Sequence, residues 1–296
     1  MNSTKTSAIQ YSLLRDIGIL VKFKLSLMVV FSSALSYLIL AGGSFSFFEF
    51  GSLMTGGLLI TFAANAMNQC LEREYDKLMK RTSARPVATG RMSLSFAVLL
   101  AGVLCTIGVF ILSMVSFQAA MLGMLSFVLY AFVYTPLKRY SPVAIPIGAI
   151  PGALPTLIAG VVACKGFTEQ AISLFALQYL WQFPHFWSIA WLGHDDYRKA
   201  GFKLIRDVEG RPDPKYGLYS AIYAGLAYFI IAFMQSVNVV HDGILIAVIS
   251  LISIYVWFGI NLYRKNNSEA ARQLMFVSFF YLPLLFMLFF LNNNLV

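Results

Sequence analysis

Nine apolar runs, each close to the length that crosses a lipid bilayer, constrain the fold of this 296-residue chain more than any other feature. A transmembrane helix needs about 20 mostly apolar residues. The runs cover residues 25–43, 48–66, 94–116, 119–137, 143–164, 171–192, 217–239, 243–262 and 273–292. Charged residues make up 12% of the chain, whereas a soluble domain carries about 25%. The sequence therefore predicts an all-α, multi-pass integral membrane protein with one domain over 1–296, in the cytoplasmic membrane if the source is bacterial.

The positions of lysine and arginine predict the topology, because these residues gather in cytoplasmic loops. If all nine runs span the membrane, every lysine and arginine except Lys165 falls on one side. The amino terminus is then cytoplasmic and the carboxyl terminus lies outside. The cytoplasmic segments include a lead-in over 1–24 and two long loops over 67–93 and 193–216. The net charge of +9 follows from this topology, so no nucleic-acid partner is expected.

A row of oxygen-bearing side chains leads from the second apolar run into the first long loop. Asn68, Glu72 and Asp76 are four positions apart, which places them on one face of a helix over about 12 Å. Such oxygen ligands suit a hard cation such as Mg²⁺, and the nearby Arg81 and Arg85 suit an anion beside it. Carboxylates close to membrane depth usually mark a functional site. The pattern predicts a metal-bound diphosphate at the membrane surface.

Acidic residues also stand where the sixth apolar run ends. Asp195 and Asp196 open the second long loop, much as Asp76 follows the second run. Both loops lie on the same predicted side, so carboxylates from the two could hold one or two Mg²⁺ ions between them. The ions would neutralise a diphosphate and draw electrons from its bridging oxygen. The apolar bundle beneath offers room for a long hydrocarbon tail.

Simpler alternatives stay open for several of these residues. Acidic residues at a solvated helix end also pair with basic neighbours, and Arg73, Lys77 and Lys80 are within reach of Glu72 and Asp76. Basic loop residues can act only as topology determinants, and this applies to Arg81, Arg85, Lys138 and Lys203. A lone histidine in an aromatic stretch, such as the one at position 185, is more often a hydrogen-bonded packing residue than a ligand.

The first motif, Asn68-xxx-Glu72-xxx-Asp76, resembles the N-x-x-x-D/E-x-x-x-D motif of the UbiA superfamily of intramembrane prenyltransferases. Five further stretches resemble, in order, the haem-farnesylating branch of that superfamily. They are Lys80–Pro86, Tyr134–Arg139, Gly148–Pro155, His185–Trp187 and Asp196–Gly201. The second superfamily motif, D-x-x-x-D, is incomplete, because Ala200 follows Asp196 by four positions and Lys199 follows Asp195. Whether a second metal position has a full ligand set therefore stays open.

The resemblance implies a nine-helix UbiA-type bundle and a specific reaction. A farnesyl group would pass from farnesyl diphosphate to the 2-vinyl group of haem B, and water would add to give haem O. It implies Mg²⁺ as the cofactor, catalytic roles for Asn68, Glu72, Asp76 and Asp196, and metal ligation by these four and Asp195. It implies substrate contacts from Arg81, Arg85, Lys138, Arg139, His185, Tyr197 and Lys203. It also implies that the product passes to a haem A synthase or to terminal oxidase assembly factors.

Two other functions compete with this interpretation. One is a UbiA-type prenyltransferase with another aromatic or tetrapyrrole acceptor, and the motifs over 134–139 and 185–201 argue against it. The other is an ion-coupled membrane transporter. Transporter sites lie near the midplane of the membrane, at broken helices. The acidic residues here gather at one membrane face, which argues against a transporter.

Overall fold

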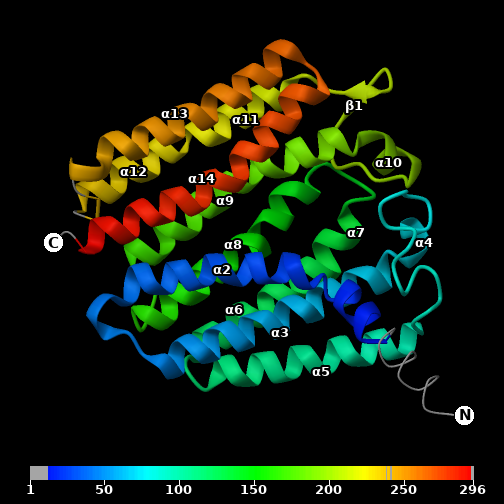
Figure 1. The fold of residues 1–296 in the computed structure, drawn as a ribbon, viewed down its shortest axis with the longest axis horizontal. Helices are drawn as coiled ribbons and strands as arrows, with labels where there is room; N and C mark the ends of the chain where they lie inside the picture. Colours follow the sequence, from blue (N-terminus) through cyan, green and yellow to red (C-terminus); the bar gives the residue numbers. More distant parts are fainter. Residues whose placement is uncertain (1–12, 238, 241, 295–296) are drawn as a thin grey trace, which may run out of the picture.

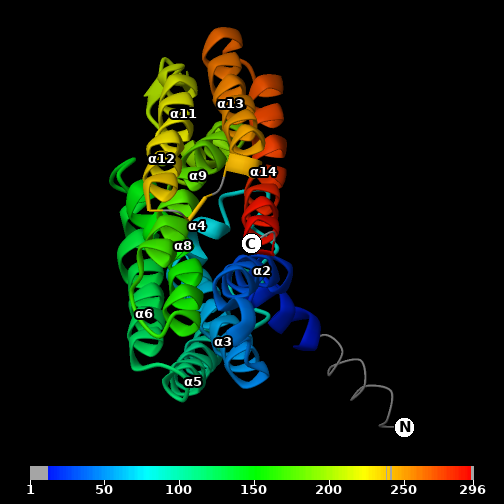
Figure 2. The same cartoon turned by 90° about the vertical axis from the view of Figure 1, so that its left-hand side faces the viewer.

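The protein is a bundle of long helices in which two groups lie side by side (Figures 1 and 2). This computed structural model describes residues 13–237, 239–240 and 242–294. The helices are α2 (Phe23–Ala41), α3 (Phe47–Leu71), α4 (Arg73–Asp76), α5 (Leu94–Ser113), α6 (Phe117–Val128), α7 (Thr135–Leu137), α8 (Ala144–Ala163), α9 (Glu169–Leu192), α10 (His194–Lys199), α11 (Lys215–Gly225), α12 (Ala227–Ser236), α13 (Asp242–Lys265) and α14 (Ser268–Asn294). A 3₁₀ turn (Gly42–Ser44), a π-helix η2 (Leu129–Tyr134) and a small hairpin of β1 (Asp207–Val208) and β2 (Arg211–Pro212) complete the elements.

Within the described residues, eight helical segments are long and apolar enough to cross a membrane. They match eight of the nine predicted runs. The segment for the sixth run, α9, is 24 residues long but carries polar side chains such as Gln178 and Gln182. It lies inside the bundle against α8, α11 and α14. An all-α, multi-pass membrane protein is thus confirmed, while the number of spans and the side of each terminus stay predictions.

Each of the two helix groups has its own buried core. Side chains of α2, α3, α5, α6 and α8 form one cluster, and those of α9 and α11–α14 form most of the other. Glycines let helices approach closely in both groups, as is usual where lipid replaces water around the bundle. A Cβ on Gly217 would lie 2.3 Å from the backbone nitrogen of Tyr263, and one on Gly108 would lie 2.9 Å from the carbonyl oxygen of Gly56. Larger side chains at these positions would separate the helices.

The proline-rich fifth run forms one continuous helix, α8. Proline at position 155 removes the hydrogen bond to the carbonyl of Pro151, four positions earlier. That carbonyl accepts a hydrogen bond of 3.2 Å from the hydroxyl of Ser126 on α6 instead. The expectation that neighbouring helices satisfy the carbonyls freed by prolines is met at this position.

The two long loops lie together at one end of the bundle, where Figure 1 shows α4 and α10 next to each other. In the same view α14 ends at the opposite end of the bundle. This relative placement is the one that the predicted topology requires. It brings the end of α3 and the end of α9 to a common region, where the candidate site is found.

Candidate active site

The first motif keeps helical spacing across the junction of α3 and α4. The backbone nitrogen of Glu72 donates to the carbonyl of Asn68 at 3.0 Å, and that of Asp76 donates to the carbonyl of Glu72 at 2.8 Å. All three side chains are buried, with exposed fractions of 5% or less. The Nδ2 of Asn68 donates to Oε2 of Glu72 at 2.9 Å, so the first two side chains share one face, as predicted.

Each member of this row faces a cation. The Nζ of Lys22 donates to Oδ1 of Asn68 at 3.0 Å, and Lys138 forms an ion pair with Glu72. Nη1 of Arg85 lies 2.7 and 2.8 Å from the two carboxylate oxygens of Asp76. Three basic side chains from α7, the first loop and the start of α2 therefore converge on one oxygen-rich cluster.

These contacts bear on the local pairing considered for the acidic residues. Local pairing on a solvated helix end would join Glu72 or Asp76 to Arg73, Lys77 or Lys80. In the structure Arg73 and Lys77 instead pair with the exposed Glu74, at 2.9 and 2.7 Å. The buried carboxylates pair with Lys138 and Arg85 rather than with these three neighbours, and metal binding at the row stays a prediction.

Two groups of the cluster have displaced pKa values. Burial raises the pKa of Asp76, although Arg85 opposes the shift. Burial of its ammonium group, together with the nearby cations Arg85 and Lys138, lowers the pKa of Lys22 to about 7. Lys22 was not among the predicted site residues. Lys22 directly precedes the first apolar run, which could have indicated a place near the site. It was assigned only to the cytoplasmic lead-in.

The donor set at this cluster fits Mg²⁺. Oε1 of Glu72 is buried and, beyond its ion pair with Lys138, accepts no well-aligned hydrogen bond from the described residues. The amide nitrogen of Asn68 is committed to Glu72 and to Thr135, so its oxygen, which accepts from Lys22, is the atom that would ligate a metal. No group of three or more His, Cys, Asp or Glu side chains in the described part of the chain could hold an ion. Mg²⁺ commonly takes one or two carboxylates and completes its shell with phosphates and water, and Asn68, Glu72 and Asp76 are oxygen donors of that kind.

The turn from the π-helix η2 into α7 holds a further polar residue, Thr135, which was not predicted as part of the site. Thr135, at the end of η2, donates from its hydroxyl to the carbonyl of Tyr130 at 2.9 Å and accepts from Nδ2 of Asn68 at 3.0 Å. The Nζ of Lys138 lies 4.8 Å from the ring centre of Tyr134. π-Helical turns are frequent at functional sites. Thr135 could have been predicted as a site residue from its place within the motif over 134–139.

The second loop contributes Asp195 and Asp196 from the short helix α10. The side chain of Asp195 is 78% exposed and lies 3.8 Å from Nδ1 of His194, whose Nε2 lies 3.1 Å from Asp207. Asp196 is half-buried. Convergence of Asp195 and Asp196 with the first motif on one metal ion therefore stays a prediction.

The two loops contact one another directly. Nη2 of Arg81 donates to the hydroxyl of Tyr197 at 3.1 Å, and the ring of Tyr75 lies 5.8 Å from that of Phe202.

The backbone nitrogen of Lys203, rather than its ammonium group, donates to the carbonyl of Lys138 at 2.7 Å. A small buried cluster of Met79, Ala200 and Phe202 fills the contact. The guanidinium of Arg139 lies 4.3 Å from the ring centre of Tyr75.

His185 occupies a different place from these groups. It lies on α9, where its Nδ1 is 2.7 Å from the hydroxyl of Ser278 on α14. The sequence analysis placed His185, Lys138 and Arg139 together near one substrate. The structure instead puts Lys138 on the carboxylate cluster and Arg139 against the first loop, while the imidazole of His185 forms its hydrogen bond with α14.

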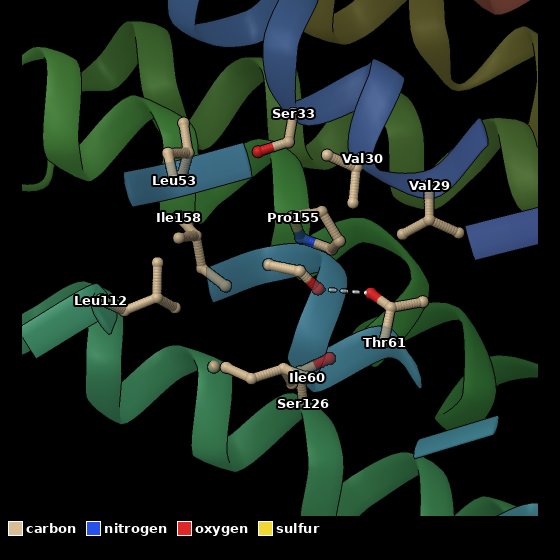
Figure 3. A pocket seen from close by; sticks show the side chains of 12 residues that line it. Val29, Val30, Ser33, Leu53, Ile60, Thr61, Leu112, Ser126, Pro155 and Ile158 are labelled. Atoms are coloured by element: carbon tan, nitrogen blue, oxygen red, sulfur yellow. Dashed lines mark hydrogen bonds between the residues drawn. The ribbon is translucent and has the colours of Figure 1, made fainter. Parts of the chain in front are cut away.

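A cavity lies deeper in the bundle, between α2, α3, α5, α6 and α8 (Figure 3). It is a small, partly open space, and apolar groups such as Ile60, Leu112 and Ile158 line it. The hydroxyl of Thr61, also in its wall, donates to the carbonyl of Gly57 at 2.8 Å. Thr61 lies about two turns, or about 10 Å, along α3 from Asn68. The wall that α3 gives to the cavity therefore begins about two turns from the first motif.

The model of the UbiA prenyltransferase family matches residues 28–289. This chain belongs to that family and is an integral membrane enzyme of the prenyltransferase class. Its relatives include the Protoheme IX farnesyltransferase of Cytophaga hutchinsonii, which is 37% identical over 280 residues, 93% of this chain and 96% of the relative. That of Flavobacterium johnsoniae is 35% identical over 303 residues, 100% of both chains.

Solved structures share the same fold at low sequence identity. A digeranylgeranylglyceryl phosphate synthase superposes with a TM-score of 0.77 at 14% identity, covering 96% of this chain and 99% of the other. A UbiA homologue from Archaeoglobus fulgidus bound to GPP and Mg²⁺ superposes with a TM-score of 0.67 at 12% identity, covering 93% and 99%. The predicted UbiA-type bundle is thereby confirmed.

Proposed function

We propose that this enzyme converts haem B to haem O by transferring the farnesyl group of farnesyl diphosphate to the 2-vinyl group of the porphyrin. The relatives named protoheme IX farnesyltransferase, which cover nearly the whole chain, support this substrate pair. The observation that carries the proposal is the contact between two motifs. Thr135 and Lys138 of the haem-branch stretch over 134–139 hold Asn68 and Glu72 of the superfamily motif.

The donor site would be the cluster at the end of α3. Asn68, Glu72 and Asp76 would hold Mg²⁺, with Asp195 and Asp196 approaching from α10. The metal would neutralise the diphosphate and draw electrons from its bridging oxygen, so that the carbon–oxygen bond breaks. The Mg²⁺-bound UbiA homologue supports a divalent metal.

Basic side chains of the cluster would then act on the diphosphate. Lys22, Arg85 and Lys138 already converge there, and they would exchange their contacts with the motif for phosphate oxygens. Arg81 would reach the diphosphate from the first loop, positioned by the hydroxyl of Tyr197. In this proposal the loops over 67–93 and 193–216 close one active site in a single domain over 1–296.

The hydrocarbon tail would extend from this cluster into the apolar cavity below it. Cleavage leaves an allylic cation, which is stabilised by aromatic faces and destroyed by water. The rings of Tyr130 and Tyr134 lie 5.4 Å apart, and they would offer two aromatic faces to the cation. Both residues belong to η2, so the π-helix would serve the donor and the cation together.

The acceptor would enter from the bilayer. The terminal vinyl carbon would bond to the farnesyl cation, and the inner carbon, now cationic, would take a hydroxyl from water and release a proton. Arg139 and Lys203 at the loops would favour the propionates, and His185 on α9 would contact the porphyrin. Passage of haem O to a haem A synthase or to terminal oxidase assembly factors belongs to the same proposal.

A product assay tests the proposed function. Purified enzyme in lipid nanodiscs is incubated with haem B, farnesyl diphosphate and Mg²⁺, and the pigments are separated and weighed by mass spectrometry. The proposal requires a product with the mass of haem B plus a farnesyl group and a hydroxyl group. A farnesylated product without the hydroxyl group would show that the proposed addition of water to the inner vinyl carbon is wrong. Transfer to another aromatic acceptor in place of haem would overturn the assignment of the substrate.

A further inference from the structure

His185 is a buried, polar residue in an apolar part of the bundle, away from the carboxylate cluster. Its side chain is 9% exposed, and it lies between α9 and α14. Nδ1 of the imidazole lies 2.7 Å from Oγ of Ser278. None of the described residues forms a hydrogen bond with the other ring nitrogen, Nε2. Only Glu72 Oε1 and Gln69 Oε1 are both fully buried and unpartnered among the described side chains, so Nε2 keeps some accessible surface and is open to a ligand.

The hydrogen bonds of Ser278 determine which nitrogen of His185 carries the proton. A hydroxyl has one hydrogen, and that of Ser278 is donated to the carbonyl of Met275 at 2.5 Å. With its hydrogen donated in this way, Ser278 accepts from the imidazole, and Nδ1 is assigned as the protonated nitrogen. Nε2 is left with a lone pair and is the only basic atom of the ring. The pair is therefore not a nucleophile with its base, because the serine proton points away from the histidine.

The surroundings hold the imidazole in one orientation. The ring of Trp181 stacks on it at 5.0 Å with an interplanar angle of 16°, and the ring of Phe279 meets it edge-on at 5.1 Å. The Nε1 of Trp181 donates to the carbonyl of Ser278 at 2.7 Å, which ties α9 to α14 at this level. Phe279 is itself 50% exposed on the outside of the bundle. The imidazole is thus rigid and close to the lipid-facing surface.

A single basic nitrogen restricts what can bind there. Protein sites for zinc and similar ions need about four ligands, and no group of three His, Cys, Asp or Glu side chains that could hold an ion occurs in the described part of the chain. An iron porphyrin brings four nitrogen ligands of its own and needs one axial ligand from the protein. A hydrogen bond from Nδ1 to an acceptor is the usual way in which a metal-binding histidine is oriented. The aromatic side chains around it suit a flat, apolar macrocycle.

We propose that Nε2 of His185 is an axial ligand of the iron of the acceptor porphyrin, and that Ser278 is the positioning residue that fixes the imidazole tautomer. This inference rests on the proposed function, because it takes haem as the acceptor. It adds the atom that recognises the metal, and it makes binding depend on the iron and not only on the porphyrin ring.

Absorption spectroscopy of haem bound to the purified protein tests this assignment. Haem B and metal-free protoporphyrin IX are titrated separately into the wild-type enzyme and into His185→Ala. We expect His185→Ala to weaken haem binding at least about tenfold and to lose the spectrum of a histidine-ligated iron, while metal-free protoporphyrin binds as before. Added imidazole should restore that spectrum. An unchanged haem spectrum in His185→Ala, or equal loss of both porphyrins without rescue by imidazole, would overturn the proposal.

Ser278→Ala provides a second test that keeps the ligand. Loss of the acceptor for Nδ1 should weaken haem binding by roughly 10-fold, as for other groups that orient a metal-binding histidine. Ser220→Ala is the matched control, because Ser220 is equally buried and also donates to a carbonyl of its own helix, that of Tyr216 at 2.7 Å. Equal effects of the two serine variants on haem binding would contradict the positioning role.

The product assay separates this inference from the proposed function. If the wild-type enzyme farnesylates haem B and the haem spectrum is unchanged in His185→Ala, the proposed function is supported and the axial role of His185 is wrong. If the wild-type enzyme binds no haem and forms no farnesylated haem, both the proposed function and the axial role of His185 are wrong.

Discussion

The Nζ of Lys22 donates a hydrogen bond of 3.0 Å to Oδ1 of Asn68, joining the start of α2 to the end of α3 across 46 positions of the chain. The amide oxygen of Asn68 is therefore held by a cation, while its nitrogen is held by Glu72 and Thr135. The orientation of the first motif residue depends on groups from three separate segments. This arrangement suggests specific tests.

Replacing Lys22 with Met should weaken binding of farnesyl diphosphate. A charge-assisted hydrogen bond contributes about 1.5–3 kcal/mol, so KM for farnesyl diphosphate should rise by roughly 10- to 100-fold. Lys24→Met is the matched control, because Lys24 is exposed and lies two positions further on. Steady-state kinetics on the two variants measure the difference. A similar KM in both would show that Lys22 acts only on topology.

Removing one carboxylate of the first motif should abolish most of the turnover. Asp76→Asn keeps the size of the side chain but removes the charge that would hold Mg²⁺, and kcat should fall by roughly 100-fold, or about 3 kcal/mol of transition-state stabilisation. EDTA should stop the wild-type enzyme in the same way. Glu74→Gln, a change at an exposed carboxylate that pairs with Arg73 and Lys77, should keep wild-type turnover. Full activity of Asp76→Asn, or of the wild type in EDTA, would contradict the metal site.

Arg85→Lys tests the geometry of the clamp rather than its charge. Nη1 of Arg85 contacts both oxygens of Asp76, which leaves the rest of the guanidinium fork for a phosphate. Lysine cannot reproduce that fork, so the apparent affinity for farnesyl diphosphate should fall by roughly 10-fold. Arg73→Lys, at an exposed position, serves as the control. An unchanged affinity in Arg85→Lys would leave this arginine as a topology determinant.

Thr135→Val should lower kcat without removing any charge from the site. The change deletes the acceptor for Asn68 and leaves the carbonyl of Tyr130 without its hydroxyl partner, a loss of about 1–3 kcal/mol for a buried polar group. Thr135→Ser keeps the hydroxyl and should behave as the wild type. The comparison is made on kcat and on thermal unfolding of the purified protein. If the Val and Ser variants have equal kcat, Thr135 has no part in orienting Asn68.

An ion pair ties the segment before α2 to the first loop and should respond to pH. Nη2 of Arg91 lies 2.9 Å from Oδ1 of Asp16, and its hydrogen bonds hold the pKa of Asp16 below the ordinary value of 3.8. Because the folded-state pKa is lowered, the tie is complete above that value and is lost as pH falls through the lowered pKa. Asp16→Asn should copy the low-pH state at neutral pH. Hydrogen exchange over residues 13–21 should therefore be faster in Asp16→Asn than in the wild type at pH 7.

Features that depend on local sequence pattern could be predicted from the sequence. The apolar runs follow from helix length, and the row of Asn68, Glu72 and Asp76 follows from helical spacing. The contacts of Lys22, Thr135 and Ser278 could not be predicted in this way, because each joins segments that are distant in the chain. The π-helix η2 was also missed, since nothing in its apolar composition differs from an ordinary helix.

The ion pairs between the first motif and its cations have a consequence for turnover. Lys138 and Arg85 each have an internal carboxylate partner that competes with phosphate for the same charge. In the proposed function, binding of the diphosphate would replace one set of ion pairs with another, which would limit its affinity. The same competition works in the opposite direction after the reaction, because the internal carboxylates can take the cations back from inorganic diphosphate. The cluster would therefore help to release its own leaving group and reduce product inhibition.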